Sequence, residues 1–125
     1  MIASNLMVGD LIQYNGEILR LYEFTHKYAY FGSGHPLNGI SLDEIEPIPP
    51  TPKILEKNGF KKYNSYGTEK YSLNDKVSVN LYGADKWLLR VDVPYNFGTT
   101  YIIFRYLHEL QHALKLCGIE KEIVA

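Results

Sequence analysis

The chain contains one segment whose residue types and spacing could perform catalysis, His108-Glu109-Leu110-Gln111-His112. It matches the H-E-x-x-H pattern of zinc metallopeptidases. On a helix, two histidines four residues apart share a face and can bind one Zn²⁺. The glutamate between them can act as general base toward a zinc-bound water. The pattern makes His108 and His112 candidate metal ligands and Glu109 a candidate catalytic residue.

Three features of the sequence count against a catalytic zinc. The stretch after His112 is too short to present a third ligand from a following helix, so that ligand would have to be His26, His35 or an acidic residue upstream. Both halves of the chain are also small for the two lobes of a peptidase cleft. Finally, the apolar seam of the helix lies well away from both histidines, which predicts that they face solvent. The seam consists of Leu107, Leu110, Leu114 and Cys117. We therefore expect no cofactor and no enzymatic activity. A zinc-dependent hydrolase ranks third, after the two binding functions considered below.

Basic and aromatic side chains form a second candidate site near the middle of the chain, a possible interaction surface made of Lys57, Lys61, Lys62, Tyr63, Tyr66 and Tyr71. Such combinations on a sheet can bind single-stranded nucleic acid. However, the chain has 13 basic and 14 acidic residues and a net charge of −1, whereas strong phosphate binders carry a basic excess. A solvated, tyrosine-rich hairpin explains the cluster better than a nucleic-acid site does.

The tyrosine content favours binding to a protein partner or to a second copy. The chain has 11 tyrosines, and tyrosine supplies a large contact area at small entropic cost. Tyrosine is also common in strands, so the count alone is no binding signature. The preferred hypothesis is a protein-interaction module, and a nucleic-acid-associated accessory factor is the alternative.

The first half of the chain is predicted to form a small barrel. Asn15-Gly16 lies between two β-rich runs and predicts a hairpin over residues 8–24, because both residues tolerate a positive φ. Further short strands are predicted at 28–31 and 39–42. This order is typical of an SH3-like barrel, which we expect over residues 1–48.

The second half, residues 51–125, is predicted to be an antiparallel sheet with a helix at each end. A proline-rich junction at 47–52 separates the halves. Thr51 is expected to cap the first helix and Asn58-Gly59 to end it. Strands are predicted in the β-rich runs 70–73, 77–82, 87–93 and 99–106, and the last helix at 107–117. Residues 119–125 are expected to be a short extension or a frayed end. The predicted class is α+β.

The cellular location is predicted from features that the sequence lacks. Cys117 is the only cysteine, so no intrachain disulfide is possible. The first ten residues show no basic and apolar pattern of a secretory signal. No apolar run approaches the ~20 residues that a membrane-spanning helix needs. We expect a cytoplasmic protein that does not enter membranes.

Parts of the chain resemble an uncharacterised group of small proteins from gut bacteria and their phages and other mobile elements. The resemblance lies in residues 47–60 and 106–114 and in the opening, with Val8-Gly9-Asp10 and Asn15-Gly16. Members of that group can carry asparagine in place of the second histidine, which would break the zinc pattern. The resemblance implies a short accessory protein of unknown role, and it transfers no functional residue.

Overall fold

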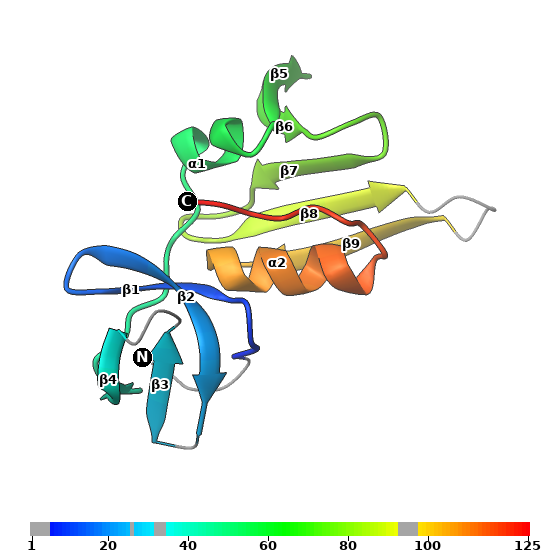
Figure 1. Ribbon diagram of the computed structural model, residues 1–125. Helices are drawn as coiled ribbons and strands as arrows, with labels where there is room; N and C mark the ends of the chain where they lie inside the picture. The colour runs from blue at the N-terminus through cyan, green and yellow to red at the C-terminus, as the bar shows by residue number, and fades with distance from the viewer. Residues whose placement is uncertain (1–5, 26, 32–34, 93–97) are drawn as a thin grey trace. The chain divides into compact units, whose positions relative to one another are not determined.

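The structure is a computed structural model, and it describes residues 6–25, 27–31, 35–92 and 98–125, with the backbone alone for 35–38. The chain divides into two compact units (Figure 1). Unit 1 consists of residues 1–48 and 106–108, and unit 2 of residues 49–105 and 109–125. Each unit contains one antiparallel sheet, and the second sheet is accompanied by helices. This confirms the α+β class.

Unit 1 is a four-stranded meander of β1 (Leu11–Tyr14), β2 (Glu17–Phe24), β3 (Tyr28–Phe31) and β4 (His35–Ser41). The predicted Asn15-Gly16 turn joins β1 to β2, with φ of 50° and 77° as a type I′ turn requires. Its core is formed by aliphatic and aromatic side chains, namely Leu6, Ile12, Leu21, Ala29, Phe31, Ile40, Leu42 and Ile45.

The small SH3-like barrel expected over residues 1–48 is confirmed only as an antiparallel sheet, and the described residues form no closed barrel. In the described part of unit 1, the free edge of β1 makes one bridge, in which Gln13 and Glu46 exchange backbone hydrogen bonds of 2.9 and 2.8 Å. After β4 the chain enters a turn, closed by the bond from Glu44 N to Ser41 O (2.9 Å). Because this turn diverts the chain, no ladder joins β4 to β1, and the sheet stays open.

Unit 2 contains a five-stranded meander in the order β5-β6-β7-β8-β9. The strands are β5 (Lys61–Ser65), β6 (Thr68–Ser72), β7 (Val77–Leu81), β8 (Trp87–Asp92) and β9 (Thr99–Phe104). The sequence analysis predicted the last four of these approximately but placed no strand at 61–65. That strand pairs residue by residue with β6 around a Tyr66-Gly67 turn.

Two helices accompany this sheet. Helix α1 (Pro52–Lys57) begins after Thr51, whose hydroxyl accepts the Ile54 amide as predicted, and Asn58 ends it. Helix α2 (Leu107–Leu116) lies in front of β8 and β9 in Figure 1. Neither described helix combines the length and the apolar character needed to cross a membrane.

Strand alternation gives the unit 2 sheet one buried face. Its buried side chains are Tyr71, Val77, Val79, Trp87, Leu89, Val91 and Phe104. The helices add Leu55, Leu110, Ala113 and Leu114 to the buried set. The segment after α2 also contributes, because Ile123 is only 1% exposed. The expectation of a frayed end at 119–125 is therefore wrong.

Candidate binding surface

The structure places the two histidines of the H-E-x-x-H segment on α2, in different environments. His108 is 3% exposed and its Nδ1 atom is buried, whereas His112 is half-buried. The expectation that both face solvent is wrong for His108, since the first turn of α2 is buried on several sides while its last turn is open. The His108 ring lies parallel to that of Tyr106, with centroids 6.0 Å apart.

A complete zinc site is not assembled by the described residues. Within ranges 6–25, 27–31, 35–92 and 98–125, no group of three or more His, Cys, Asp or Glu side chains could hold a metal ion. Two histidines considered as third ligands, His26 and the side chain of His35, lie outside the described residues. Glu109 has a structural contact instead, because its Oε1 accepts the backbone amide of Arg105 (2.9 Å).

The predicted basic and aromatic cluster does not form one surface, because β5 directs alternate side chains to opposite faces. Lys61 and Tyr63 lie on one face, and Lys62 lies on the other, opposite Tyr71. Tyr71 is 4% exposed and packs edge-on against Trp87, with ring centroids 6.1 Å apart. Tyr71 is therefore a core residue and cannot present its ring to a partner.

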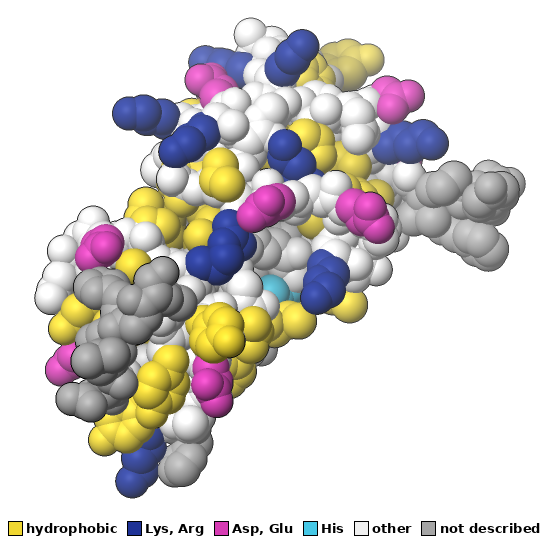
Figure 2. Space-filling model, in the orientation of Figure 1, with side chains coloured by type: hydrophobic (Ala, Val, Ile, Leu, Met, Phe, Trp, Pro, Cys, Tyr) yellow, Lys and Arg dark blue, Asp and Glu magenta, His cyan; other side chains and the backbone are white. Residues whose placement is uncertain are grey.

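Two lysines of the cluster make contacts within unit 2. Lys57 Nζ donates to the Ala125 carbonyl oxygen (2.9 Å), and Lys62 Nζ pairs with Glu69 Oε1 (3.0 Å). The hydrogen bond to Glu69 and the charge of that carboxylate raise the pKa of Lys62 above its ordinary value. Figure 2 shows Lys and Arg side chains spread over α1 and the β5–β6 hairpin at the top, with acidic side chains among them. This part of unit 2 is a mixed-charge surface.

The face of the unit 2 sheet opposite the core carries the more coherent surface, which we call the open face. Its strand register defines two adjacent rows across all five strands. One row is Tyr63, Lys70, Asn80, Leu88 and Ile103, and the other is Lys61, Ser72, Ser78, Arg90 and Tyr101. All ten side chains are exposed or half-buried. The described part of the chain therefore leaves this face accessible.

Positive charge dominates these two rows. They contain Lys61, Lys70 and Arg90 and no carboxylate. Two carboxylates border them at the hollow, Asp75 and Asp92. Asp92 pairs with Arg90 (3.4 Å) and accepts a hydrogen bond from Thr99 Oγ1 (2.9 Å). An acidic partner group would thus find the two lysines available and Arg90 partly neutralised.

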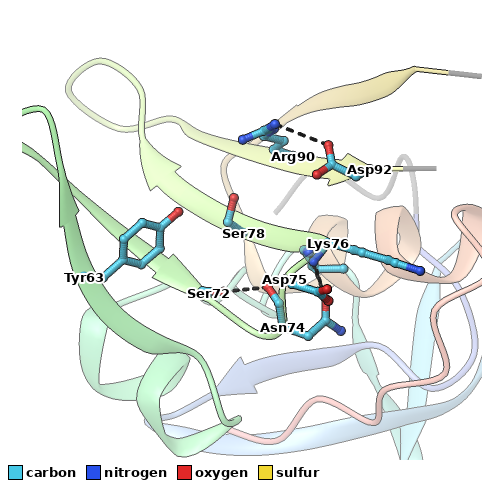
Figure 3. Close-up of a pocket in the computed structure, with 9 residues that line it drawn as sticks. Tyr63, Ser72, Asn74, Asp75, Lys76, Ser78, Arg90 and Asp92 are labelled. Atoms are coloured by element: carbon cyan, nitrogen blue, oxygen red, sulfur yellow. Dashed lines mark hydrogen bonds and ion pairs between the residues drawn. The ribbon is translucent and has the colours of Figure 1, made fainter. Parts of the chain in front are cut away.

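Small side chains leave a hollow of about 150 Å³ in the open face. Ser72 and Ser78 lie at its floor, and the Tyr63 ring and Arg90 flank it (Figure 3). The turn between β6 and β7 forms its rim, where Asn74 Oδ1 accepts the amides of Lys76 (2.8 Å) and Val77 (3.0 Å). The lining offers hydroxyl, guanidinium and aromatic groups for contact, together with the carboxylates of Asp75 and Asp92 and the ammonium group of Lys76.

Aromatic side chains mark the two outer strands of the open face. Tyr63 on β5 is 40% exposed, and Tyr101 on β9 is 59% exposed. Four strand spacings of ~4.8 Å separate these strands, which places the two residues about 20 Å apart. One small molecule cannot contact both rings, whereas a macromolecular partner can.

Tyr66, at the tip of the β5–β6 hairpin, is fully exposed and has φ of 51°. With Gly67 at φ 80° it forms a turn with two positive φ angles, a position that favours asparagine or glycine. Its ring adds nothing to the core, and its backbone is strained. An exposed ring on a strained backbone makes Tyr66 a candidate for contact with a partner.

The sequence analysis missed most of the open face, including Arg90, Tyr101 and Ile103. The relevant signal was the alternation of residues 87–93, in which Arg90 and Asp92 share a face, and its continuation into 99–104. Grouping by proximity in the sequence selected residues 57–71 instead. The strand register, which brings residues 40 positions apart into one row, was needed to find this face.

No protein-family model, no curated protein and no solved structure matches this chain. The geometry of unit 2 therefore carries the functional argument alone.

Proposed function

We propose that the protein is a non-enzymatic interaction module that binds a protein partner through the open face of unit 2. The observation that supports this is the arrangement of Tyr63 and Tyr101 at the outer strands, with Lys61 beside Tyr63 on β5 and with Lys70 and Arg90 on the strands between. The partner would present carboxylates to the lysines and apolar groups to the tyrosines. Aromatic residues with arginine are the combination on which protein interfaces most depend.

The extent of the open face sets the expected strength of binding. Five strands of about five residues cover about 400 Å², from the standard strand spacing and rise. A stable interface usually buries about 800 Å² on each partner. The exposed ring of Tyr66 extends the available area beyond the sheet. We infer a transient complex whose affinity depends on salt.

The biological setting of this proposal is an accessory role in a bacterium, a phage or another mobile element. It rests on the resemblance of residues 47–60 and 106–114 to small proteins of such genomes. A cytoplasmic location is part of the proposal, because a single cysteine is typical of a reducing compartment.

Single-stranded nucleic acid is the second candidate ligand, because exposed tyrosines share the open face with basic residues. The distance between the two tyrosines favours nucleic acid less than a protein partner. The ~20 Å between Tyr63 and Tyr101 equals about six nucleotides of a stacked strand at ~3.4 Å each. The two rings could not hold neighbouring bases.

The test compares two variants with equal charge change. Lys61→Glu/Lys70→Glu reverses charge on the open face, whereas Lys53→Glu/Lys121→Glu reverses two exposed lysines elsewhere in unit 2. Each tagged protein is used to capture partners from a bacterial lysate, and captured proteins are identified by mass spectrometry. Circular dichroism checks that both variants fold.

The proposal is supported if a protein is captured by the wild type and the control variant, is lost with the open-face variant, and binds again as a purified pair. If no protein meets all three conditions, the proposal is wrong. Fluorescence anisotropy with single-stranded and duplex DNA tests the second candidate. Binding of DNA that Tyr63→Ala and Tyr101→Ala both weaken would replace the protein partner by nucleic acid.

A further inference from the structure

Strand β9 forms an edge of the unit 2 sheet whose composition differs sharply from that of the opposite edge. Its sequence, Thr99-Thr100-Tyr101-Ile102-Ile103-Phe104, contains no charge, proline or glycine. The opposite edge, β5, carries Lys61 and Lys62. Lysines on an edge strand discourage pairing with another chain, whereas a flat apolar edge promotes it. Only one of the two edges is protected in this way.

The backbone of β9 is available for further pairing. In an antiparallel ladder, every second residue of an edge strand directs its N–H and C=O away from the sheet. In the described part of the chain, the backbone of residues 100–104 makes hydrogen bonds only within the ladder to β8. A further strand could therefore join the sheet without breaking a backbone hydrogen bond of the described residues.

Two exposed side chains border this edge on the open face. Tyr101 is 59% exposed and Ile103 is 54% exposed. They are two residues apart and so lie on the same side of the strand. Aromatic and β-branched side chains are a favourable cross-strand pair when they lie directly opposite each other.

We propose that β9 pairs antiparallel with β9 of a second copy of this chain, with Ile102 opposite the partner's Ile102. In this register, Tyr101 lies opposite the partner's Ile103, and Ile103 opposite the partner's Tyr101. The contact is isologous, as a two-fold axis requires. It also keeps both buried faces on the same side of the joined sheet, since directly opposite residues in a ladder point the same way.

The pattern of β9 selects a second copy over a foreign strand. Each of the two exposed side chains meets a favourable counterpart when the same sequence runs in the opposite direction, so the strand is complementary to itself. The strand offers no charge by which it could select a different chain. Pairing would join two open faces into one ten-stranded surface of about 800 Å², from the standard strand dimensions. The inference concerns the edge and stands whether or not the open face binds a partner.

Sedimentation velocity over a range of protein concentrations tests the pairing. We expect the wild type to shift from monomer to dimer as concentration rises. Tyr101→Lys, which places a lysine near a second copy's Ile103, should raise the dissociation constant at least about tenfold. The matched control is Tyr82→Lys, because Tyr82 is similarly exposed (53% against 59% for Tyr101) but follows the central strand β7. The control should dimerise like the wild type.

The register predicts a specific rescue. In the double variant Tyr101→Lys/Ile103→Glu, each introduced lysine would lie opposite the introduced glutamate of the other copy, and dimerisation should return. Tyr101→Lys/Ile103→Lys carries two like charges and should stay monomeric. A wild type that is monomeric at every concentration, a dimer insensitive to Tyr101→Lys, or a double variant that shows no rescue would each overturn the proposal.

Discussion

The side chain of Asn58 holds the backbone of Val124, a residue 66 positions later in the chain. Its Nδ2 donates to the Val124 carbonyl (2.6 Å), and its Oδ1 accepts the Val124 amide (2.8 Å). The same Nδ2 donates to the Ile54 carbonyl in the last turn of α1 (2.8 Å). Asn58 is 3% exposed, and Val124 is 39% exposed, so these bonds are partly buried. The residue thus ends α1 and fixes the segment that carries buried Ile123.

Asn58→Ala is expected to lower the free energy of unfolding by about 1–3 kcal/mol, because it removes the two hydrogen bonds that hold the amide and the carbonyl of Val124. Urea denaturation followed by circular dichroism measures the change. Asn64→Ala is the control, since Asn64 is exposed on β5. It should alter stability by less than about 0.5 kcal/mol. Equal losses in both variants would show that the bonds to Val124 contribute nothing.

The role of Asn58 illustrates how far local sequence signals reach. The sequence analysis predicted the Asn15-Gly16 turn, the Thr51 cap and the stop at Asn58-Gly59, and the structure confirms all three. Each depends on the φ angle or hydrogen bonds of a few neighbouring residues. The bonds from Asn58 to Val124 depend on the path of the whole chain, so no local pattern could reveal them.

The same limit explains the errors in the candidate sites. Strand β5 was missed because its turn carries Tyr66, where asparagine is the usual signal. The burial of His108 was missed because a helical wheel treats every turn of α2 alike. Finding the open face required pairing Tyr63 with Lys70 and Arg90 with Tyr101, which only the strand register supplies.

Tyr66→Asn is expected to stabilise the protein by about 1 kcal/mol, because asparagine tolerates the left-handed conformation better than tyrosine. The ring of Tyr66 is fully exposed, so its removal costs no packing. Thermal unfolding measures the effect. Asn15 has nearly the same φ as Tyr66, 50° against 51°. The reciprocal variant Asn15→Tyr should therefore destabilise the first hairpin. A loss of stability in Tyr66→Asn would show that the ring supports the fold.

Zinc added to the protein is expected to show no tight, stoichiometric binding in a calorimetric titration. His108 is buried and His112 half-buried on α2, and the described residues supply no third donor near them. Two histidines four residues apart bind metal weakly without a completed ligand set. Submicromolar binding of one zinc ion, abolished by His112→Ala, would contradict this and restore the hydrolase hypothesis.

The pKa of Lys62 is expected to lie above its ordinary value and to fall toward it in Glu69→Gln, because the hydrogen bond to Glu69 is the main cause of the increase. NMR titration of the lysine side chains measures both values. Glu56→Gln is the control, since Glu56 makes the smallest contribution to the shift. A pKa that Glu69→Gln leaves unchanged would contradict the assignment.

The direction of this shift also determines how the pair affects stability with pH. A raised pKa in the folded state means that the folded protein holds the Lys62 proton more tightly than the unfolded chain does. The resulting stabilisation is complete below the ordinary lysine pKa and is lost as pH rises through the higher pKa of the folded state. Both side chains are about half exposed, at 49% and 58%, so the effect is small and salt should weaken it. The stability difference between the wild type and Glu69→Gln should therefore be constant from neutral to mildly alkaline pH and disappear in strong alkali.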